Sequence, residues 1–468
     1  MNSARPAAPP QPASGQHDGA TDAPPAGSRA YVYRISLVAA LGGLLFGYDT
    51  AIINGAIVFL KRHFALSAFQ TEVAASSLLL GCVLGASIAG ALGDWLGRRK
   101  LLLASAAIFA VSAVATALPR NLVELCLARL AAGIAIGIAS MLAPLYIAEV
   151  SPAAIRGRLV SMNQFAIISG ILISYLAGWL LSQLGEESWR WMFLSAVLPS
   201  LLFFFALFTV PESPRWLAKE GREAEALDVL ARLGGDGAAA GRLQEIRSAI
   251  EQETGSFKEL FQPALRRPLV VGLTLAVLQQ VTGINTILYY GSIIFTEQVG
   301  TESTSAALWA NVVIGFVNLA GTVIALYVID RLGRKSLLMA ASGGMGVSLI
   351  LLGAVFFARP TAGAAVLAMI LCYVGFFAVG MGPGVWVLLS ELFPTRIRAR
   401  AMSIATVSLW IACMVISLTF LSLVSAISAA GAFWVYAAMC VFTFFFVWRV
   451  TPETKGKSLE QIERSWFR

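Results

Sequence analysis

The chain has 468 residues, of which 58% are hydrophobic and only 13% are charged. Soluble domains average about 45–50% apolar and about 25% charged residues, so this composition excludes an ordinary soluble enzyme. A net charge of +8 can indicate a nucleic-acid partner, but in this chain the basic residues lie beside long apolar segments and follow a membrane topology. A lipid bilayer is the solvent that fits this chain.

Residues 1–30 are rich in Pro, Ala, Gly and Ser and contain no apolar run. Such a segment cannot bury enough apolar surface to fold, and it lacks the basic-then-apolar pattern of a cleaved signal peptide. Asp18, Asp22 and the scarcity of Arg disfavour a transit peptide. We therefore predict a disordered cytosolic tail over residues 1–30.

Ten long stretches after this tail contain no Asp, Glu, Lys or Arg. A spanning helix needs about 20 apolar residues, so nine stretches hold one helix each, and the last is long enough for two, divided near Ser428. The segment 35–60 adds a helix interrupted only by Asp49. The sequence predicts an all-α membrane protein with twelve transmembrane helices. The stretches are 73–93, 101–119, 130–148, 159–185, 191–211, 268–296, 303–329, 336–358, 360–390 and 401–448.

Small residues recur at every fourth position in the second and fourth of these helices. Such stripes let two helix backbones approach closely, so we expect them to be packing surfaces. The stripes are Gly81, Gly85, Ala89 and Gly93, and Gly133 and Gly137.

Asp49 and Arg129 are the two ionisable residues that lie inside apolar segments. Such residues are expensive to insert and mark function by default. One alternative is a permanent ion pair that only joins two helices. The functional interpretation is a proton site: burial favours the neutral carboxyl and a nearby guanidinium favours the carboxylate, so movement of Arg129 would load and release a proton.

The segment 212–267 separates two six-helix halves and contains short amphipathic stretches, at residues 222–233 and 243–250. We predict a cytosolic linker of short helices.

The basic residues concentrate on the side of the membrane where this linker lies, and cytoplasmic loops are the ones that carry an excess of Lys and Arg. We therefore expect a multi-pass protein of the cell membrane, in bacteria the inner membrane, with both termini in the cytoplasm. The predicted domains are 1–30 tail, 31–211 bundle, 212–267 linker, 268–451 bundle and 452–468 tail.

Cysteine and histidine usage gives no sign of a metal site or a cofactor. The five cysteines lie in hydrophobic segments without metal or redox spacing, so we interpret them as packing residues. His17 and His63 are isolated, and no nucleophile motif indicates an enzyme. The cysteines are Cys82, Cys126, Cys372, Cys413 and Cys440.

Charged motifs at the helix ends occur twice, at nearly constant offset, so the chain is interpreted as a duplicated six-helix unit. Three sets repeat with the same internal spacing. They are Asp94-x2-Gly97-Arg98-Arg99 with Asp330-x2-Gly333-Arg334-Lys335, Glu149-x2-Pro152-x2-Ile155-Arg156-x-Arg158 with Glu391-x2-Pro394-x2-Ile397-Arg398-x-Arg400, and Pro211-Glu212-Ser213 with Pro452-Glu453-Thr454.

Together these motifs resemble the sugar porter family of the major facilitator superfamily. The resemblance also rests on Gln279-Gln280-x4-Asn285-x3-Tyr289-Tyr290 and Trp189-Arg190-x-Met192-Phe193, and it covers residues 32–463. It implies two pseudo-symmetric six-helix bundles with a site near mid-membrane between them.

The resemblance implies that the repeated charges form a cytosolic gate. Carboxylates and guanidinium groups at these positions can pair and can cap facing helix ends, and such pairs would close the cytosolic side in one state and break in the other. The expected gate residues are Asp94, Arg98, Glu149, Arg158 and Glu212 in one copy, and Asp330, Arg334, Glu391, Arg400 and Glu453 in the other.

The resemblance also implies a sugar site built from amides, which bind hydroxyls, and aromatic rings, which cover the C–H face. Alternative roles for single residues are interhelical contacts and interfacial anchoring. The expected residues are Phe46, Gln164, Gln279, Gln280, Asn285, Tyr289, Asn318, Gly382, Trp386 and Trp410.

A straight seventh helix cannot aim its polar residues at one ligand, because at 100° per residue they spread around the helix. We predict breaks at Gly283 and Gly291, and unwinding of the tenth helix over residues 380–384, where Gly and Pro weaken the helix. The C-terminal half is then expected to close over the sugar, while the N-terminal half carries the proton.

The expected function is monosaccharide import, of a hexose or a pentose, by proton symport, with the protein acting as a monomer. In the family that the chain resembles, an acid at the position of Asp49 marks proton symporters. The alternatives are a passive facilitator of a sugar or an inositol-like polyol, and a sugar sensor. Leu409 replaces the amide that is common in the family, which leaves the identity of the sugar open.

Overall fold

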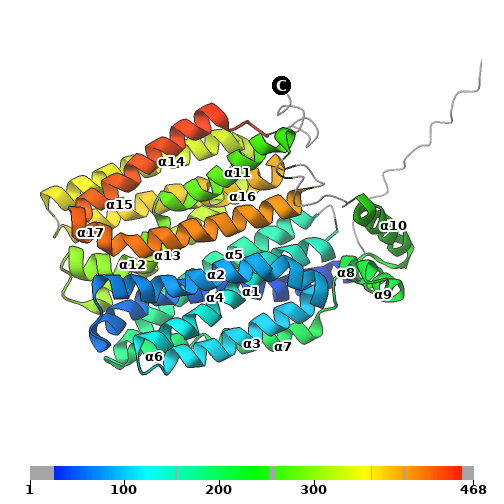
Figure 1. Ribbon diagram of the computed structural model, residues 1–468, viewed down its shortest axis with the longest axis horizontal. Helices are drawn as coiled ribbons and strands as arrows, with labels where there is room; N and C mark the ends of the chain where they lie inside the picture. The colour runs from blue at the N-terminus through cyan, green and yellow to red at the C-terminus, as the bar shows by residue number, and fades with distance from the viewer. Residues whose placement is uncertain are drawn as a thin grey trace, which may run out of the picture.

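The computed structural model describes residues 26–152, 155–252, 260, 262–359, 361–393 and 397–455. Every regular element in this part of the chain is a helix, and the long helices lie side by side along the long axis of the molecule (Figure 1). Three short helices stand apart at one end, which we call the insert end; the opposite end is the far end.

The N-terminal half contains six crossings, the sixth made of two helices in succession. Helix α1 begins at Ala26, so the prediction of disorder is wrong for residues 26–30; a long helix extends easily by adding one hydrogen bond per residue. The rest of the predicted tail, residues 1–25, lies outside the described residues. The helices are α1 Ala26–His63, α2 Ala68–Leu96, α3 Arg98–Ala117, α4 Leu122–Val150, α5 Arg156–Leu181, α6 Ser188–Leu194 and α7 Val197–Ala206.

The C-terminal half follows the insert and also crosses six times. Its first helix begins at Pro263, before the expected boundary at residue 268. The helices are α11 Pro263–Val281, α12 Ile284–Ile293, α13 Thr304–Leu332, α14 Arg334–Ala358, α15 Gly363–Phe376, α16 Gly382–Leu392 and α17 Arg398–Val450, with π-helical segments at Ile294–Gln298 and Phe377–Met381.

Eleven helical segments of the described chain are long and apolar enough to span a membrane, and the last of them spans twice. Helix α17 has 53 residues, about 80 Å of helix, whereas a bilayer core is about 30 Å thick. Ser428 breaks it with a φ of 73°, and its orange and red parts meet at the far end (Figure 1). The predicted count of twelve crossings, divided near Ser428, is confirmed.

The predicted break at Gly283 separates α11 from α12. Gly283 has a φ of 94°, and a Cβ there would lie 2.8 Å from the ring of Tyr436, so both conformation and space require glycine. Gly291 is not a break: it lies inside α12, where a Cβ would lie 2.1 Å from Asn311 Oδ1. Glycine at this position therefore serves close packing.

The tenth crossing is not unwound, contrary to the prediction for residues 380–384. It passes through the π-helical segment Phe377–Met381 into α16, which has Pro383 in its first turn. Proline has no N–H to donate, so one backbone hydrogen bond is missing where the π-helical turn passes into α-helix. A π-helical turn adds one residue per turn and is a common feature of functional sites.

Helices α2 and α4 approach closely along the predicted glycine stripes. A Cβ on Gly133 would lie 1.9 Å from the carbonyl oxygen of Leu78, and a Cβ on Gly81 would lie 2.2 Å from that of Leu130. The two backbones are therefore in direct contact, and the stripes are packing surfaces.

Gly133→Ala is expected to destabilise the N-terminal bundle, because the methyl group cannot fit without moving α2 away from α4. Overpacking of this kind costs typically about 1–3 kcal/mol. The check is the melting temperature of the purified protein in detergent, with Gly90→Ala as control because a Cβ on Gly90 meets nothing within 4 Å. Equal melting temperatures for the two variants would contradict the close contact.

The insert forms α8 Pro214–Lys219, α9 Glu223–Gly234 and α10 Asp236–Gln252. The predicted amphipathic stretches lie in α9 and α10. The buried face of α9 consists of Ala226, Val229, Leu230 and Leu233, whereas Leu227 is exposed. These helices lie beside the insert end of the N-terminal bundle (Figure 1).

Candidate functional site

Asp49 and Arg129 are both buried in the N-terminal bundle, on α1 and α4. They interact electrostatically but form no ion pair with each other. The Arg129 guanidinium instead lies over the Phe193 ring, 5.5 Å from its centroid, and its Nε and Nη2 atoms have no hydrogen-bond partner among the described residues. In this conformation the two residues therefore do not form the permanent ion pair that was the alternative to a proton site.

Three predicted amides of α11 and α12 form a chain of hydrogen bonds, which we call the amide relay: Gln279, Gln280 and Asn285. Gln280 Nε2 donates to Gln279 Oε1 at 3.2 Å, and Asn285 Nδ2 donates to Gln280 Oε1 at 2.5 Å. The break at Gly283 places these side chains together, although a straight helix would spread them apart. Gln279 and Gln280 are buried, and Asn285 is half-buried.

The relay begins at the π-helical segment of the tenth crossing. Gln279 Nε2 donates to the carbonyl oxygens of Met381 and Gly382 at 3.1 and 2.9 Å. The break at Gly283 and the π-helical segment therefore meet, and the backbone of Gly382, a predicted sugar-binding residue, accepts a hydrogen bond from Gln279.

The relay ends at Cys413 of α17, a residue that its sequence context predicts only as a packing residue. Asn285 Nδ2 donates to Cys413 Sγ at 3.1 Å, and the Tyr289 hydroxyl lies 3.8 Å from the same sulfur. Cys413 follows Leu409 by four residues, so the two lie on one face of α17. Leu409 stands where the family commonly has an amide, and the four-residue spacing places Cys413 on the same face of the helix. This spacing is the signal in the sequence that could have indicated a role for Cys413 in the site.

Aromatic rings from the two bundles meet beside the relay's helices. The rings of Phe46 on α1 and Trp410 on α17 have centroids 5.3 Å apart. Among the described residues, the side chains of Gln164, Asn318 and Trp386 make no hydrogen bond and are not part of the relay; Asn318 is buried and the other two are half-buried.

Polar contacts join the two bundles near the far end, and the sequence motifs predict none of them. Asn54 on α1 donates from Nδ2 to the carbonyl oxygen of Leu288 at 2.8 Å and accepts at Oδ1 from the N–H of Ser292 at 2.8 Å. These two backbone groups of α12 are the i−4 and i partners of a helical hydrogen bond. The Tyr175 hydroxyl also donates to the Leu288 carbonyl, at 2.7 Å.

Two acidic residues, Glu72 and Glu297, make further contacts between the bundles near the far end. Glu72 on α2 accepts from the N–H and the hydroxyl of Ser422 on α17 at 2.7 and 2.6 Å. Lys61 of α1 pairs with Glu297 at 2.6 Å. The far end is therefore closed by contacts between the bundles.

Asn54→Ala is expected to favour opening of the far end, because it removes three side-chain contacts between the bundles: those to Leu288 and Ser292, which keep their helical partners, and one to Asn311 Oδ1 at 3.1 Å. Three hydrogen bonds of about 1 kcal/mol each correspond to roughly a hundredfold change in the equilibrium. The measurement is the maleimide labelling rate of a Val58→Cys variant, since Val58 lines a cavity at this end, in a Cys372→Ala background. An unchanged rate would contradict the role of Asn54, and Asn121→Ala serves as control.

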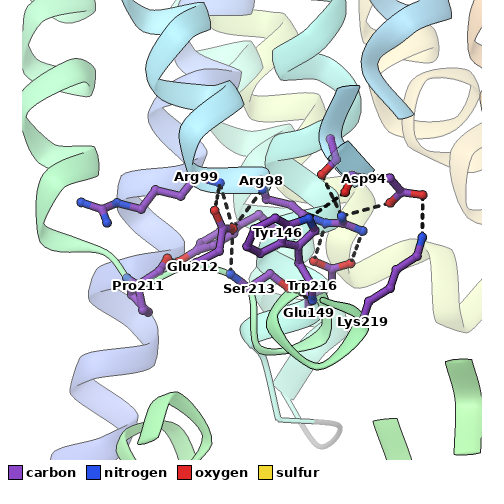
Figure 2. A network of polar contacts seen from close by, with 11 residues as sticks. Asp94, Arg98, Arg99, Tyr146, Glu149, Pro211, Glu212, Ser213, Trp216 and Lys219 are labelled. Carbon is purple, nitrogen blue, oxygen red and sulfur yellow. Dashed lines mark hydrogen bonds and ion pairs between the residues drawn. The ribbon is translucent and has the colours of Figure 1, made fainter. Parts of the chain in front are cut away.

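At the insert end of the N-terminal bundle, Arg98 lies at the centre of a polar network (Figure 2). It pairs with Asp94 at 3.0 Å and with Glu149 at 3.1 Å. Lys219 of the insert pairs with the other oxygen of Asp94 at 2.8 Å. Arg158, expected in the same set, is exposed at the start of α5 and makes no ion pair with any described residue; the chain at residues 153–154 before it is not described.

Glu212 caps α3 rather than pairing with a side chain. Its carboxylate accepts the backbone N–H groups of Arg98 at 2.9 Å and Arg99 at 3.0 Å, the first residues of that helix (Figure 2). The first N–H groups of a helix are free to bind an anion. A Cβ on Gly97, whose φ is 94°, would lie 2.5 Å from the Glu212 carboxylate, so glycine lets the acid approach.

The C-terminal bundle repeats this arrangement. Arg334 pairs with Glu391 at 2.9 Å, and Glu453 accepts the N–H groups of Arg334 and Lys335 at 3.0 and 3.1 Å. The side chain of Asp330 lies outside the described residues. Arg400, expected in the same set, also has an interaction partner. The Arg98–Glu149 and Arg334–Glu391 pairs each join parts of one bundle in this conformation. A gate formed by these residues stays a prediction.

Backbone hydrogen bonds determine the charge of Glu453. Burial alone would raise the pKa of this carboxyl, but the N–H groups of Lys455, Arg334, Lys335 and Thr454 lower the pKa below its usual range. The cap is therefore a carboxylate at neutral pH, and the stability that it contributes is lost as the pH falls through this lowered pKa.

Two matching six-helix bundles around buried polar groups define a secondary transporter. The family model "Sugar (and other) transporter" matches residues 35–466. The arabinose-proton symporter of Bacillus subtilis is 41% identical over 448 residues, which cover 94% of this chain and 96% of that protein. The D-xylose-proton symporter of Escherichia coli K12 is 39% identical over 477 residues, covering 93% and 96%.

Solved structures give the same result. The partially occluded inward-open conformation of the xylose transporter XylE from E. coli has a TM-score of 0.83 and 36% identity, covering 92% of this chain and all of that one. XylE bound to 6-bromo-6-deoxy-D-glucose has a TM-score of 0.80 and 37% identity, covering 94% and 100%. This chain belongs to the sugar transporter family, of major facilitator fold.

Proposed function

We propose that this protein imports a monosaccharide by proton symport through alternating access. The observation that carries the proposal is the unpaired Asp49 and Arg129, buried in one bundle, together with the amide relay in the other. The relatives named as arabinose-proton and D-xylose-proton symporters support it. No catalytic role is part of the proposal.

The insert end is assigned to the cytoplasm and the far end to the outside, in a bacterial inner membrane, with the protein acting as a monomer. The basic residues concentrate at the insert end, which supports this orientation. With contacts between the bundles at the far end, the conformation of the structure corresponds to one closed to the outside.

In the proposed cycle, Asp49 binds a proton from the outside while Arg129 is withdrawn, and the bundles then rock to expose the site inside. Approach of Arg129 favours the carboxylate and releases the proton. The sugar binds between the amide relay and the rings of Phe46 and Trp410, which offer hydrogen-bonding groups and an apolar face. The repeated charge networks keep the inner ends of each bundle rigid while the bundles rock.

The test is uptake of radiolabelled hexoses, pentoses and myo-inositol by proteoliposomes, with and without an inward proton gradient. The proposal expects at least one monosaccharide to accumulate above its external concentration, and an uncoupler to abolish that accumulation. Equilibration without accumulation would instead favour a passive facilitator. Saturable binding without flux would favour a sensor.

A passive polyol carrier is the second candidate. Leu409 is buried beside Trp410, so α17 offers no amide there, and the major myo-inositol transporter IolT of B. subtilis is 37% identical over 449 residues. Preferential transport of myo-inositol without proton dependence would support it.

A further inference from the structure

We infer that the backbone of the tenth crossing fixes the direction of the hydrogen bonds in the whole amide relay. A sugar hydroxyl that binds Asn285 must then be the hydrogen-bond donor. Cys413 is the positioning residue that maintains this arrangement. The inference rests on the proposed sugar site and adds which partner the sugar must offer there. It follows from the direction of five hydrogen bonds.

The first step is set by groups that cannot change role. The carbonyl oxygens of Met381 and Gly382 accept hydrogen bonds and have no hydrogen to donate. The side-chain atom of Gln279 that faces them, at 3.1 and 2.9 Å, must therefore be its amide nitrogen. Both hydrogens of that nitrogen are used, and the Gln279 oxygen is left to accept.

Each following amide inherits this direction. Gln279 Oε1 can only accept, so Gln280 must turn its nitrogen toward it, at 3.2 Å. Gln280 Oε1 then faces Asn285, whose nitrogen donates to it at 2.5 Å. A flip of any one amide would bring two oxygens or two nitrogens together, so the relay has a single consistent orientation.

Cys413 completes the relay by taking the last hydrogen. Asn285 Nδ2 has two hydrogens, one directed to Gln280 and the other to Cys413 Sγ at 3.1 Å. A thiol sulfur accepts hydrogen bonds weakly, and Cys413, which is 1% exposed, is held in place between Asn285 and the Tyr289 hydroxyl. Asn285 therefore has no free donor.

The group left over is Asn285 Oδ1. It receives no hydrogen bond from the described residues, and Asn285 is half-buried. A sugar hydroxyl that contacts Asn285 must therefore donate its hydrogen. Gln280 keeps one free N–H hydrogen, so the two neighbouring amides offer the sugar opposite polarities: an acceptor on Asn285 and a donor on Gln280.

Fluorinated sugars separate these roles, because fluorine can accept weakly but cannot donate. The experiment measures kcat/KM for uptake of D-xylose and of its monodeoxy and monofluoro analogues into proteoliposomes, or of the sugar that the uptake panel identifies. The sugar hydroxyl that Asn285 binds is identified as the one whose removal lowers kcat/KM in the unchanged protein but not in the Asn285→Ala variant. In the unchanged protein, both analogues at that position are expected to lose about tenfold or more.

Cys413→Ala should release the second hydrogen of Asn285 Nδ2. The fluoro analogue is then expected to improve severalfold relative to the deoxy analogue at the same position, whereas Cys413→Ser, which keeps an acceptor, should retain the fluoro-to-deoxy ratio of the unchanged protein whatever its overall rate. Cys372→Ala is the matched control, since Cys372 is exposed and outside the relay. A merely structural role of Cys413 would lower transport of all analogues alike.

Two results would overturn the inference while leaving the proposed function intact: a fluoro analogue transported as well as the parent sugar at the Asn285 position, or a fluoro-to-deoxy ratio that Cys413→Ala does not change. Failure of every sugar to enter with the unchanged protein would overturn the proposed function and this inference together.

Discussion

Replacement of Asp49 by Asn is expected to abolish sugar accumulation while leaving sugar exchange intact. Asn has nearly the same shape but cannot bind and release a proton, so sugar movement is no longer driven by the proton. A potential of 100 mV is worth about 2.3 kcal/mol per proton, which corresponds to roughly fiftyfold accumulation at equilibrium. The accumulation ratio of the Asp49→Asn variant should fall to about one.

The measurement compares accumulation under an imposed potential with counterflow, in which labelled sugar exchanges against unlabelled sugar and needs no net proton movement. Glu302→Gln is a suitable control, because it removes an exposed acid from a loop at the far end. If the Asp49→Asn protein still accumulates sugar, and an uncoupler abolishes that accumulation, the proton site lies elsewhere.

Arg98→Ala is expected to have the second largest effect, acting on rate and stability more than on sugar selectivity. The side chains of Arg98 and Glu149 are only 7% and 6% exposed. Removal of one partner of a buried ion pair leaves the other charge uncompensated and costs typically about 3–5 kcal/mol. The ratio of kcat/KM between two sugars should stay unchanged, because neither residue lies in the amide relay.

The other bundle provides the matched comparison. In the equivalent pair, the side chains of Arg334 and Glu391 are 14% and 22% exposed, so solvent screens the charge that remains. Arg334→Ala should therefore lower the melting temperature in detergent and the transport rate less than Arg98→Ala does. The reverse order would show that burial does not decide the strength of these pairs.

The spans and the duplication were predictable because each depends on local sequence. A charge-free apolar run of sufficient length indicates a spanning helix, and the break at Gly283 follows from a backbone conformation that glycine adopts readily. The start of α1 at Ala26 was missed because a neighbouring helix can extend into a weakly helical sequence. The π-helical segment before Gly382 was missed because Gly and Pro weaken a helix without specifying the result.

The site was predictable only as a set of residue types. The amides Gln279, Gln280 and Asn285 were expected together by resemblance, but their directional relay depends on carbonyl groups about 100 residues away. Cys413 and Asn54 were missed for the same reason: their roles arise from neighbours on other helices, and their own segments look like ordinary packing.

The capping role of Glu212 is a similar case. The repetition of Pro-Glu-Ser and Pro-Glu-Thr marked two acids as related, yet a pairing with side chains was as plausible as the observed bonds to backbone N–H groups. Only the positions of the helix ends decide between them.

The most direct test of the central claim, that sugar and proton move together, is the internal pH of proteoliposomes when sugar is added outside without any imposed gradient. The proposed mechanism predicts that entering sugar carries protons inward and acidifies the interior, and that Asp49→Asn vesicles take up the sugar without this acidification. Sugar entry into vesicles of the unchanged protein with no change in internal pH would contradict proton symport.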